Sequence, residues 1–193
     1  VFGDTMVVNG KTWPYLEVEP RLYRFRFLNG TNARFLILGF DKPLQFHQIG
    51  TEGGLLPDSP VVQDQLYMGP AERADVIVDF SKFKVGDEIL LLNQGPDSPL
   101  GSLPVEASDL ANNETTGQVM KFKVVQLTDQ GNPGVIPAQL PSIARLTTTL
   151  PERFLTLNET AYMPLDIPVQ ARMGTLNHGG LNFEDPITEN PML

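Results

Sequence analysis

The sequence predicts an all-β protein, an antiparallel sandwich or barrel of the Greek-key type. Apolar and polar residues alternate in several short segments, as they do along a strand with one buried face. Turn-forming residues separate these segments, with 17 glycines and 17 prolines in 193 residues. No segment keeps a sustained apolar period of 3.6 residues, so only short helical turns are expected.

The opening of the chain is predicted to form sheet. Asn9-Gly10 is a typical hairpin turn, and Pro20 ends the segment that follows it. The next strand alternates, and one of its faces consists of Tyr23, Phe25 and Phe27. The opposite face consists of Arg24, Arg26 and Leu28.

Later segments extend the sheet prediction to about eight or nine short strands, the number typical of a sandwich. Two runs are apolar throughout and are expected to be fully buried strands, namely Phe35–Leu38 and Ile89–Leu92. Two segments alternate, with Val76, Val78 and Phe80 inward in the first and Met120, Phe122 and Val124 inward in the second. Gln45–Ile49 and Leu66–Met68 are two further strands, and residues 94–118 are expected to form a loop.

The chain is long enough for one domain and part of another. Residues 1–127 are predicted to form the first domain, and the Pro- and Gly-rich residues 128–150 a linker. Residues 151–193 resume strand alternation, and Glu184–Pro191 resembles the opening unit, so we expect the start of a second, truncated domain. The alternative is that residues 151–193 complete the first sandwich.

Charge and hydropathy exclude several classes of partner. The 14 basic and 23 acidic residues give a net charge of −9, which repels nucleic acid and anionic membrane surfaces. No apolar run approaches the roughly 20 residues that a spanning helix needs. We therefore expect no nucleic-acid partner and no membrane span.

The residue inventory predicts no metal site and no cofactor-binding residue. The chain has no cysteine and two histidines, His47 and His178. A blue-copper site uses two histidines and a cysteine, and a catalytic zinc site takes three protein ligands. His47 lies within a predicted strand and is expected to be structural or at the surface, whereas His178 lies at a Gly-rich turn.

No catalytic residue is predicted either. The paired carboxylates Glu17/Glu19, Glu72/Asp75 and Asp87/Glu88 are interpreted as solvated acidic turns, and no Gly-x-Ser-x-Gly nucleophile motif is present. Gly50–Gly54 resembles a phosphate-binding loop, but no Lys-Ser/Thr pair or helix follows it, so it is predicted to be a turn. Three sequons permit N-glycosylation in a eukaryotic secretory route, at Asn29, Asn113 and Asn158.

Several strings resemble a known family in their order and spacing. They are Val8–Arg21 (VNGKTWPYLEVEPR) with Tyr23–Arg26, then Gln48–Leu56, Gly69–Phe80, Gly117–Phe122 and Glu184–Glu189. Together they resemble the middle domain of a three-domain multicopper oxidase, in the branch of spore-coat laccases, bilirubin oxidases and phenoxazinone synthase. The resemblance covers nearly the whole chain and is weakest at residues 94–116 and 128–150.

The resemblance implies a cupredoxin-like Greek-key sandwich between first and third domains that hold the copper. In this family His-x-His pairs and a His-Cys-His motif bind copper, and none of them occurs here, so no copper ligand is carried over. The parent protein is expected to oxidise phenolic or tetrapyrrole-type substrates by one-electron steps and to reduce dioxygen to water. The resemblance also implies an extracytoplasmic location, whether secreted, periplasmic or in the spore coat.

Pro70, Glu72 and Arg73 of the family strings are assigned to turn geometry and ion pairing. This fragment alone is therefore expected to be a structural domain and not an enzyme, with the flanking domains as its partners. Self-association through the truncated edge is a further expectation. The alternatives are a copper-free scaffold of the periplasmic division-associated type and a sandwich that binds a ligand or partner.

Overall fold

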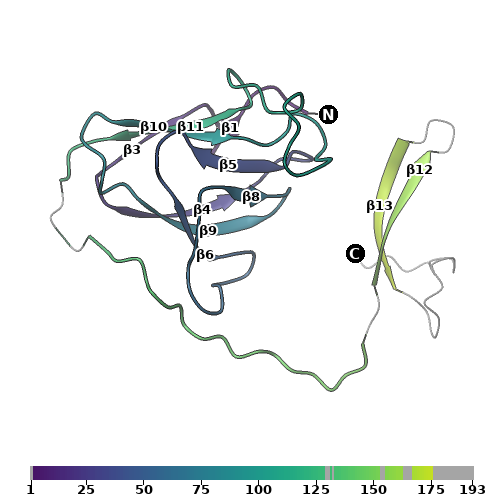
Figure 1. Ribbon diagram of the computed structural model, residues 1–193. Coiled ribbons are helices and arrows are strands. Elements are labelled where there is room, and N and C mark those ends of the chain that lie inside the picture. Colours follow the sequence, from purple (N-terminus) through teal and green to yellow (C-terminus); the bar gives the residue numbers. More distant parts are fainter. Residues whose placement is uncertain (1, 129–130, 132, 153–154, 163–166, 176–193) are drawn as a thin grey trace. The chain divides into compact units, whose positions relative to one another are not determined.

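The computed structural model describes residues 2–128, 131, 133–152, 155–162 and 167–175 (Figure 1). The chain divides into two compact units, Val1–Ile143 and Ala144–Leu193. Each unit is described by itself. None of the described residues belongs to a helix with the length and apolarity needed to cross a bilayer.

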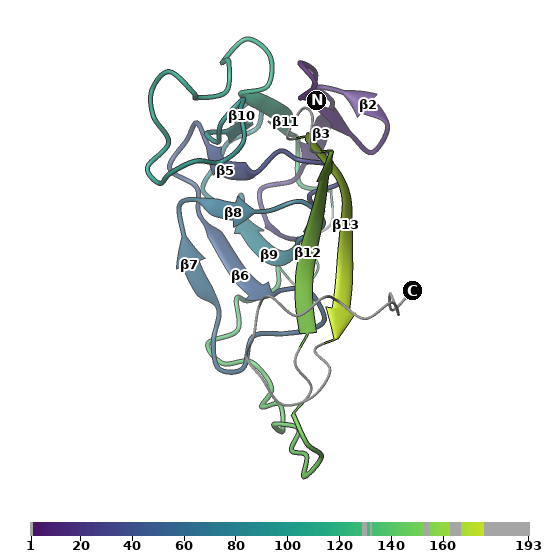
Figure 2. The same ribbon diagram turned by 90° about the vertical axis from the view of Figure 1, so that its right-hand side faces the viewer.

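Two stacked sheets form the body of the first unit (Figures 1 and 2). One has five strands in the order β3-β11-β10-β5-β8, and the other has four in the order β4-β9-β6-β7. The five-stranded sheet consists of β3 (Tyr15–Val18), β5 (Leu36–Phe40), β8 (Leu66–Met68), β10 (Glu88–Asn93) and β11 (Gln118–Val124). The four-stranded sheet consists of β4 (Leu22–Leu28), β6 (Phe46–Gly50), β7 (Val61–Gln63) and β9 (Arg73–Asp79).

The predicted opening turn is confirmed. Strands β1 (Val7–Val8) and β2 (Lys11–Thr12) pair antiparallel, with Val8 opposite Lys11. Asn9 and Gly10 both adopt positive φ, at 49° and 81°. This conformation is required in a two-residue type I′ hairpin turn, and Asn-Gly is the dipeptide that adopts it most readily.

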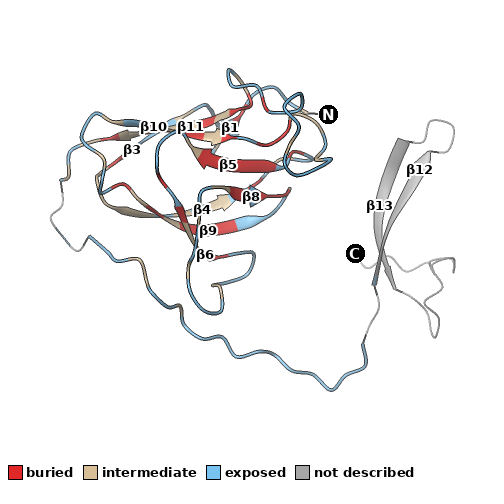
Figure 3. Ribbon diagram, viewed as in Figure 1, coloured by how far each residue is buried: buried red, intermediate tan, exposed pale blue. Residues whose placement is uncertain are grey.

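The core lies between the two sheets, where their buried faces meet (Figure 3). The predicted alternation of β4 is confirmed, since Tyr23, Phe25 and Phe27 are half-buried against the core and the residues between them are exposed. The alternation of β9 is likewise confirmed, because Val76 and Val78 are fully buried. Aromatic rings dominate the centre, in the contacts Phe25–Phe122, Phe80–Phe122, Phe40–Phe122, Phe40–Phe46 and Phe27–Phe46.

Two apolar runs that were predicted to be fully buried are only partly so. Phe35 precedes β5 and is 38% exposed. Leu90 and Leu92 of β10 are half-buried, because they lie on the outer face of an alternating strand. A β-bulge opposite Leu91 and Leu92 makes Val119 an extra residue in β11. Val119 is therefore buried although the regular alternation did not predict it, while Met120 is half-buried and packs against the core as predicted.

The described part of the first unit differs from a purely antiparallel sandwich at β3. This strand pairs with β11 in parallel, from Tyr15 opposite Lys121 to Val18 opposite Val124. Residues 94–117 contain no strand, as expected, apart from an isolated bridge between Pro96 and Leu110. Turns and bends, with no helix among the described residues, make the connections.

The second unit contains an antiparallel hairpin of β12 (Leu155–Tyr162) and β13 (Ile167–Thr175), with a register shift between Thr160 and Ala161. The predicted strand at Arg153–Leu157 thus begins at Leu155 in the described residues. The predicted turn at His178 and the segment Glu184–Pro191 lie outside the described residues.

Candidate functional site

The family string Gly69–Phe80 consists of the turn before β9 and β9 itself. Ala71 adopts a φ of 68°, and the Glu72 carboxylate accepts a hydrogen bond from the Gly69 N–H at 2.7 Å. Arg73 forms an ion pair with Glu52 at 2.8 Å. The predicted roles of Glu72 in turn geometry and of Arg73 in ion pairing therefore agree with these contacts.

The Arg73–Glu52 ion pair joins this turn to the Gly50–Gly54 turn. The Thr51 N–H donates to the Gly54 carbonyl at 3.0 Å, and Gly50 bridges to Leu55 across the loop. A Cβ atom added at Gly50 would lie 2.7 Å from the Gly54 carbonyl oxygen. The segment is a tight hairpin turn, as predicted, and it opens no helix that could bind a phosphate.

Asn29, which follows β4, anchors the turn before β9. Its side chain is 1% exposed, and its amide nitrogen donates to the carbonyls of Arg34 and Met68 at 2.8 and 3.0 Å. Its amide oxygen accepts bonds from the backbone N–H and the hydroxyl of Thr31. The sequon asparagine at position 29 is thus fully bonded and buried in the folded chain, whereas Asn113 is exposed.

A buried arginine ties three distant segments together. Arg34 is 5% exposed and forms an ion pair with Asp97, while it also donates to the carbonyls of Pro96 and Gly3. Its guanidinium lies 5.2 Å from the centroid of the Phe2 ring. The N-terminal segment and the loop after β10 are therefore fixed to the β4–β5 connection by one side chain.

Asp97 completes this cluster from the long loop. Burial acts to raise the pKa of Asp97, but the hydrogen bonds from the Thr116 hydroxyl, the Asn112 N–H and Arg34 outweigh it and hold that pKa below its usual value. The Thr116 hydroxyl lies 2.6 Å from the carboxylate. No sequence pattern predicts this cluster, because Arg34 and Asp97 are 63 positions apart.

The acidic pairs that were interpreted as solvated turns are more strongly bound than expected. Asp75 accepts a bidentate bond from Arg24, at 2.8 and 2.5 Å, and the pKa of Arg24 is raised by that bond. Glu88 accepts a bond from Lys121 at 2.8 Å, which lowers its pKa. These carboxylates are structural ion-pair partners, and none of them forms a carboxylate dyad suited to acid–base catalysis.

His47 lies on the outer face of the four-stranded sheet. It is half-buried in β6 and opposite Val62 of β7 and Ile77 of β9. Both residues opposite His47 in the sheet are apolar, so neither can serve as a second ligand for a metal ion. Over the part of the chain that the structure describes, no three His, Cys, Asp or Glu side chains are grouped so that they could hold a metal ion.

Comparisons with known proteins define the class of this fold. No protein-family model matches the chain. The multicopper oxidase McoA of the hyperthermophile Aquifex aeolicus superposes with a TM-score of 0.62 at 34% identity, over 82% of this chain and 33% of that one. The described sandwich is thus a cupredoxin-type domain.

Sequence comparison then gives the family. The laccase of Bacillus subtilis (strain 168) is 36% identical over 194 aligned residues, which span 98% of this chain and 34% of the laccase. Bilirubin oxidase of Albifimbria verrucaria is 37% identical over 161 residues, 79% of this chain and 27% of that enzyme. The chain belongs to the multicopper oxidase family, and it spans about a third of the length of these relatives.

Proposed function

We propose that this chain is the copper-free middle domain of a three-domain multicopper oxidase, followed by the start of the third domain. The observation that carries the proposal is the alignment of 98% of the chain with only 34% of a laccase. A segment that makes up 34% of a three-domain protein has the size of one cupredoxin domain and its connection to the next. Residues 1–127 are the middle domain in this proposal, 128–150 the linker, and 151–193 the beginning of the third domain.

The residues of the chain do not fit a copper site. A blue-copper centre takes a cysteine thiolate and two imidazoles, and the chain has no cysteine and only two histidines. His47 sits among apolar neighbours on the outer face of a sheet. The proposed contribution of the chain is therefore architectural, and no step of electron transfer is assigned to its residues.

The internal bonding of the first unit suits an architectural role. Asn29, Arg34 and Glu72 fix the turns at one end of the sandwich to backbone groups. Arg24 and Asp75 cross-link β4 and β9 on the outer face. Such a domain would hold the flanking domains, its partners in the same chain, at a fixed spacing.

The parent protein, in this proposal, binds copper in its flanking domains and reduces dioxygen to water with electrons taken singly from phenolic or tetrapyrrole-type substrates. An extracytoplasmic location accompanies that activity. The relatives named as laccase and bilirubin oxidase support this class of substrates.

The test is the sequence that adjoins residues 1–193 in the parent protein. The proposal predicts His-x-His pairs on both sides and a His-Cys-His motif on the C-terminal side. Other residues at those positions would contradict the oxidase and favour a copper-free scaffold with the same three-domain fold. The purified parent protein should consume dioxygen with a phenolic substrate only if the adjoining sequence contains these motifs.

A further inference from the structure

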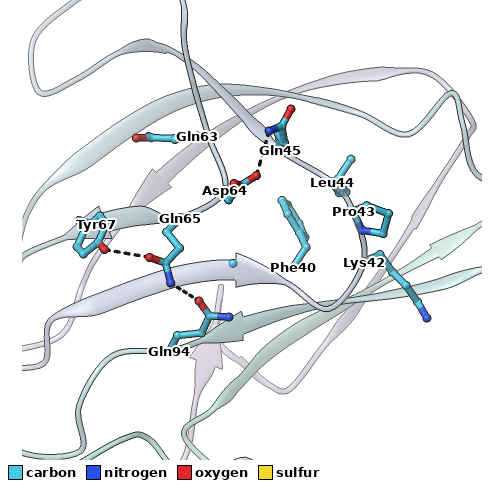
Figure 4. Close-up of a pocket in the computed structure, with 11 residues that line it drawn as sticks. Phe40, Lys42, Pro43, Leu44, Gln45, Gln63, Asp64, Gln65, Tyr67 and Gln94 are labelled. Carbon is cyan, nitrogen blue, oxygen red and sulfur yellow. Dashed lines mark hydrogen bonds between the residues drawn. The ribbon is translucent and has the colours of Figure 1, made fainter. Parts of the chain in front are cut away.

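A pocket of about 840 Å³ opens on the first unit beside the crossing from β7 to β8 (Figure 4). Its walls come from the end of β5, the turn at residues 42–45, the segment 63–67 and Gln94. Its volume is within the roughly 300–1,000 Å³ of small-molecule sites. Segments far apart in the sequence therefore converge on one concave surface.

Amide side chains dominate the polar lining of this pocket. The Tyr67 hydroxyl donates to the Gln65 amide oxygen at 2.9 Å, and the Gln65 amide nitrogen donates to the Gln94 oxygen at 2.5 Å. In a second pair, the Gln45 amide nitrogen donates to Asp64 at 3.0 Å (Figure 4). These contacts hold the side chains in place before any ligand arrives.

The same groups keep hydrogen-bonding capacity for a ligand. A glutamine amide offers two donor hydrogens and an oxygen with two lone pairs, and a carboxylate offers two oxygens. Within the described contacts, the Gln94 nitrogen and the second oxygen of Asp64 are unused. The pocket thus presents an unused donor group and an unused acceptor to a ligand.

An aromatic ring lies beside these polar groups. Phe40 is half-buried and stacks on the fully buried Phe46, with ring centroids 4.6 Å apart. In the close-up its ring lies between Gln65 on one side and Pro43 and Leu44 on the other (Figure 4). Tyr67, which is 52% exposed, adds a second ring at the rim.

We propose that this pocket binds a neutral oligosaccharide. Every sugar hydroxyl is both a donor and an acceptor, which matches planar amides paired with a carboxylate. The C–H face of a pyranose ring is apolar and suits contact with an aromatic ring. Lys42 and Asp64 carry opposite charges, so the pocket has no net charge that would select an anion or a cation.

Solution NMR on the 193-residue chain tests the proposal, with cellotriose, maltotriose and mannotriose added separately. We expect at least one trisaccharide to cause saturable shifts of the backbone amide signals of Gly39, Gln65 and Gln94. The Gln94→Ala variant removes two hydrogen bonds to the ligand and should weaken binding about tenfold. Gly39→Ala should weaken it as well, since its Cβ would lie 3.1 Å from the Gln94 oxygen.

The matched control is Gln126→Ala, an exposed glutamine outside the pocket, and it should leave the affinity unchanged. Thermal unfolding of each variant verifies that the fold is intact. The proposal is overturned if none of the three trisaccharides gives a saturable shift, or if binding survives Gln94→Ala unchanged. It is also overturned if the parent protein, unlike the chain, binds none of them, because a neighbouring domain then fills the pocket.

Discussion

Two polar clusters of the first unit begin at adjacent residues and differ in what surrounds them. Asn93 is 3% exposed, and its side chain bonds the backbone of Ile37, Gly95 and Thr116. Gln94 is exposed, and its side chain bonds another amide in an open pocket. The buried amide is committed to the fold, whereas the exposed amide keeps hydrogen-bonding capacity for a ligand.

The buried cluster extends to Arg34, where the largest effect on stability is expected. Arg34→Met removes the donor that the Pro96 and Gly3 carbonyls share, and it removes the ion-pair partner of Asp97, which keeps its bonds from Thr116 and Asn112. We expect the free energy of unfolding to fall by about 3 kcal/mol. Urea unfolding measures it, with the exposed Arg26→Met as the control expected to change by less than about 0.5 kcal/mol. Equal effects of the two substitutions would contradict the importance of the cluster.

The adjacent residues Asn93 and Gln94 allow the contributions of a buried and an exposed amide to stability to be compared directly. Asn93→Ala should lower the free energy of unfolding by about 2 kcal/mol, because buried backbone groups lose their partners. Gln94→Ala should change it by no more than about 0.5 kcal/mol. Chemical unfolding of both variants under the same conditions gives the difference. A larger loss for Gln94→Ala would show that the pocket amides are structural.

Two glycines of the Gly50–Gly54 turn, Gly50 and Gly53, test how tightly the backbone of this turn is packed. Gly50→Ala places a methyl group against the Gly54 carbonyl, and we expect a loss of about 1–2 kcal/mol. An added Cβ at Gly53 meets no atom within 4 Å, so Gly53→Ala should be nearly neutral. Thermal unfolding of both variants decides, and a neutral Gly50→Ala would refute the tight turn.

The pH dependence of stability tests Asp97 and is the smallest expected effect. The pKa of Asp97 is lowered in the folded chain, so its contribution is present above the ordinary carboxyl pKa and is lost as the pH falls through the lowered value. The carboxylate is 35% exposed, and solvent weakens the effect. The stability difference between the wild type and Asp97→Asn should therefore shrink below about pH 4. A difference that stays constant as the pH falls would contradict this role.

Local patterns in the sequence predicted the strands well where each residue's burial follows from alternation. Tyr23, Phe25 and Phe27 are examples, as is the Asn9-Gly10 turn. The prediction failed at Phe35 and at Leu90, because an apolar run does not reveal which face of a strand meets the core.

Contacts between distant segments could not be predicted in the same way. The bulge that buries Val119 depends on how two strands pair, and the Arg34–Asp97 pair depends on how a long loop folds back. The pocket around Gln94 is built from several separate segments. Family resemblance pointed to roles for Glu72 and Arg73 in turn geometry and ion pairing, but not to the partners that they contact.

In the proposed function this chain holds no copper and serves as architecture for domains that do. The most direct test is the copper content of the purified 193-residue chain after saturation with cupric and cuprous ions and removal of the excess. We expect less than stoichiometric copper and no intense visible absorption band. One or more tightly bound copper ions per chain would contradict it.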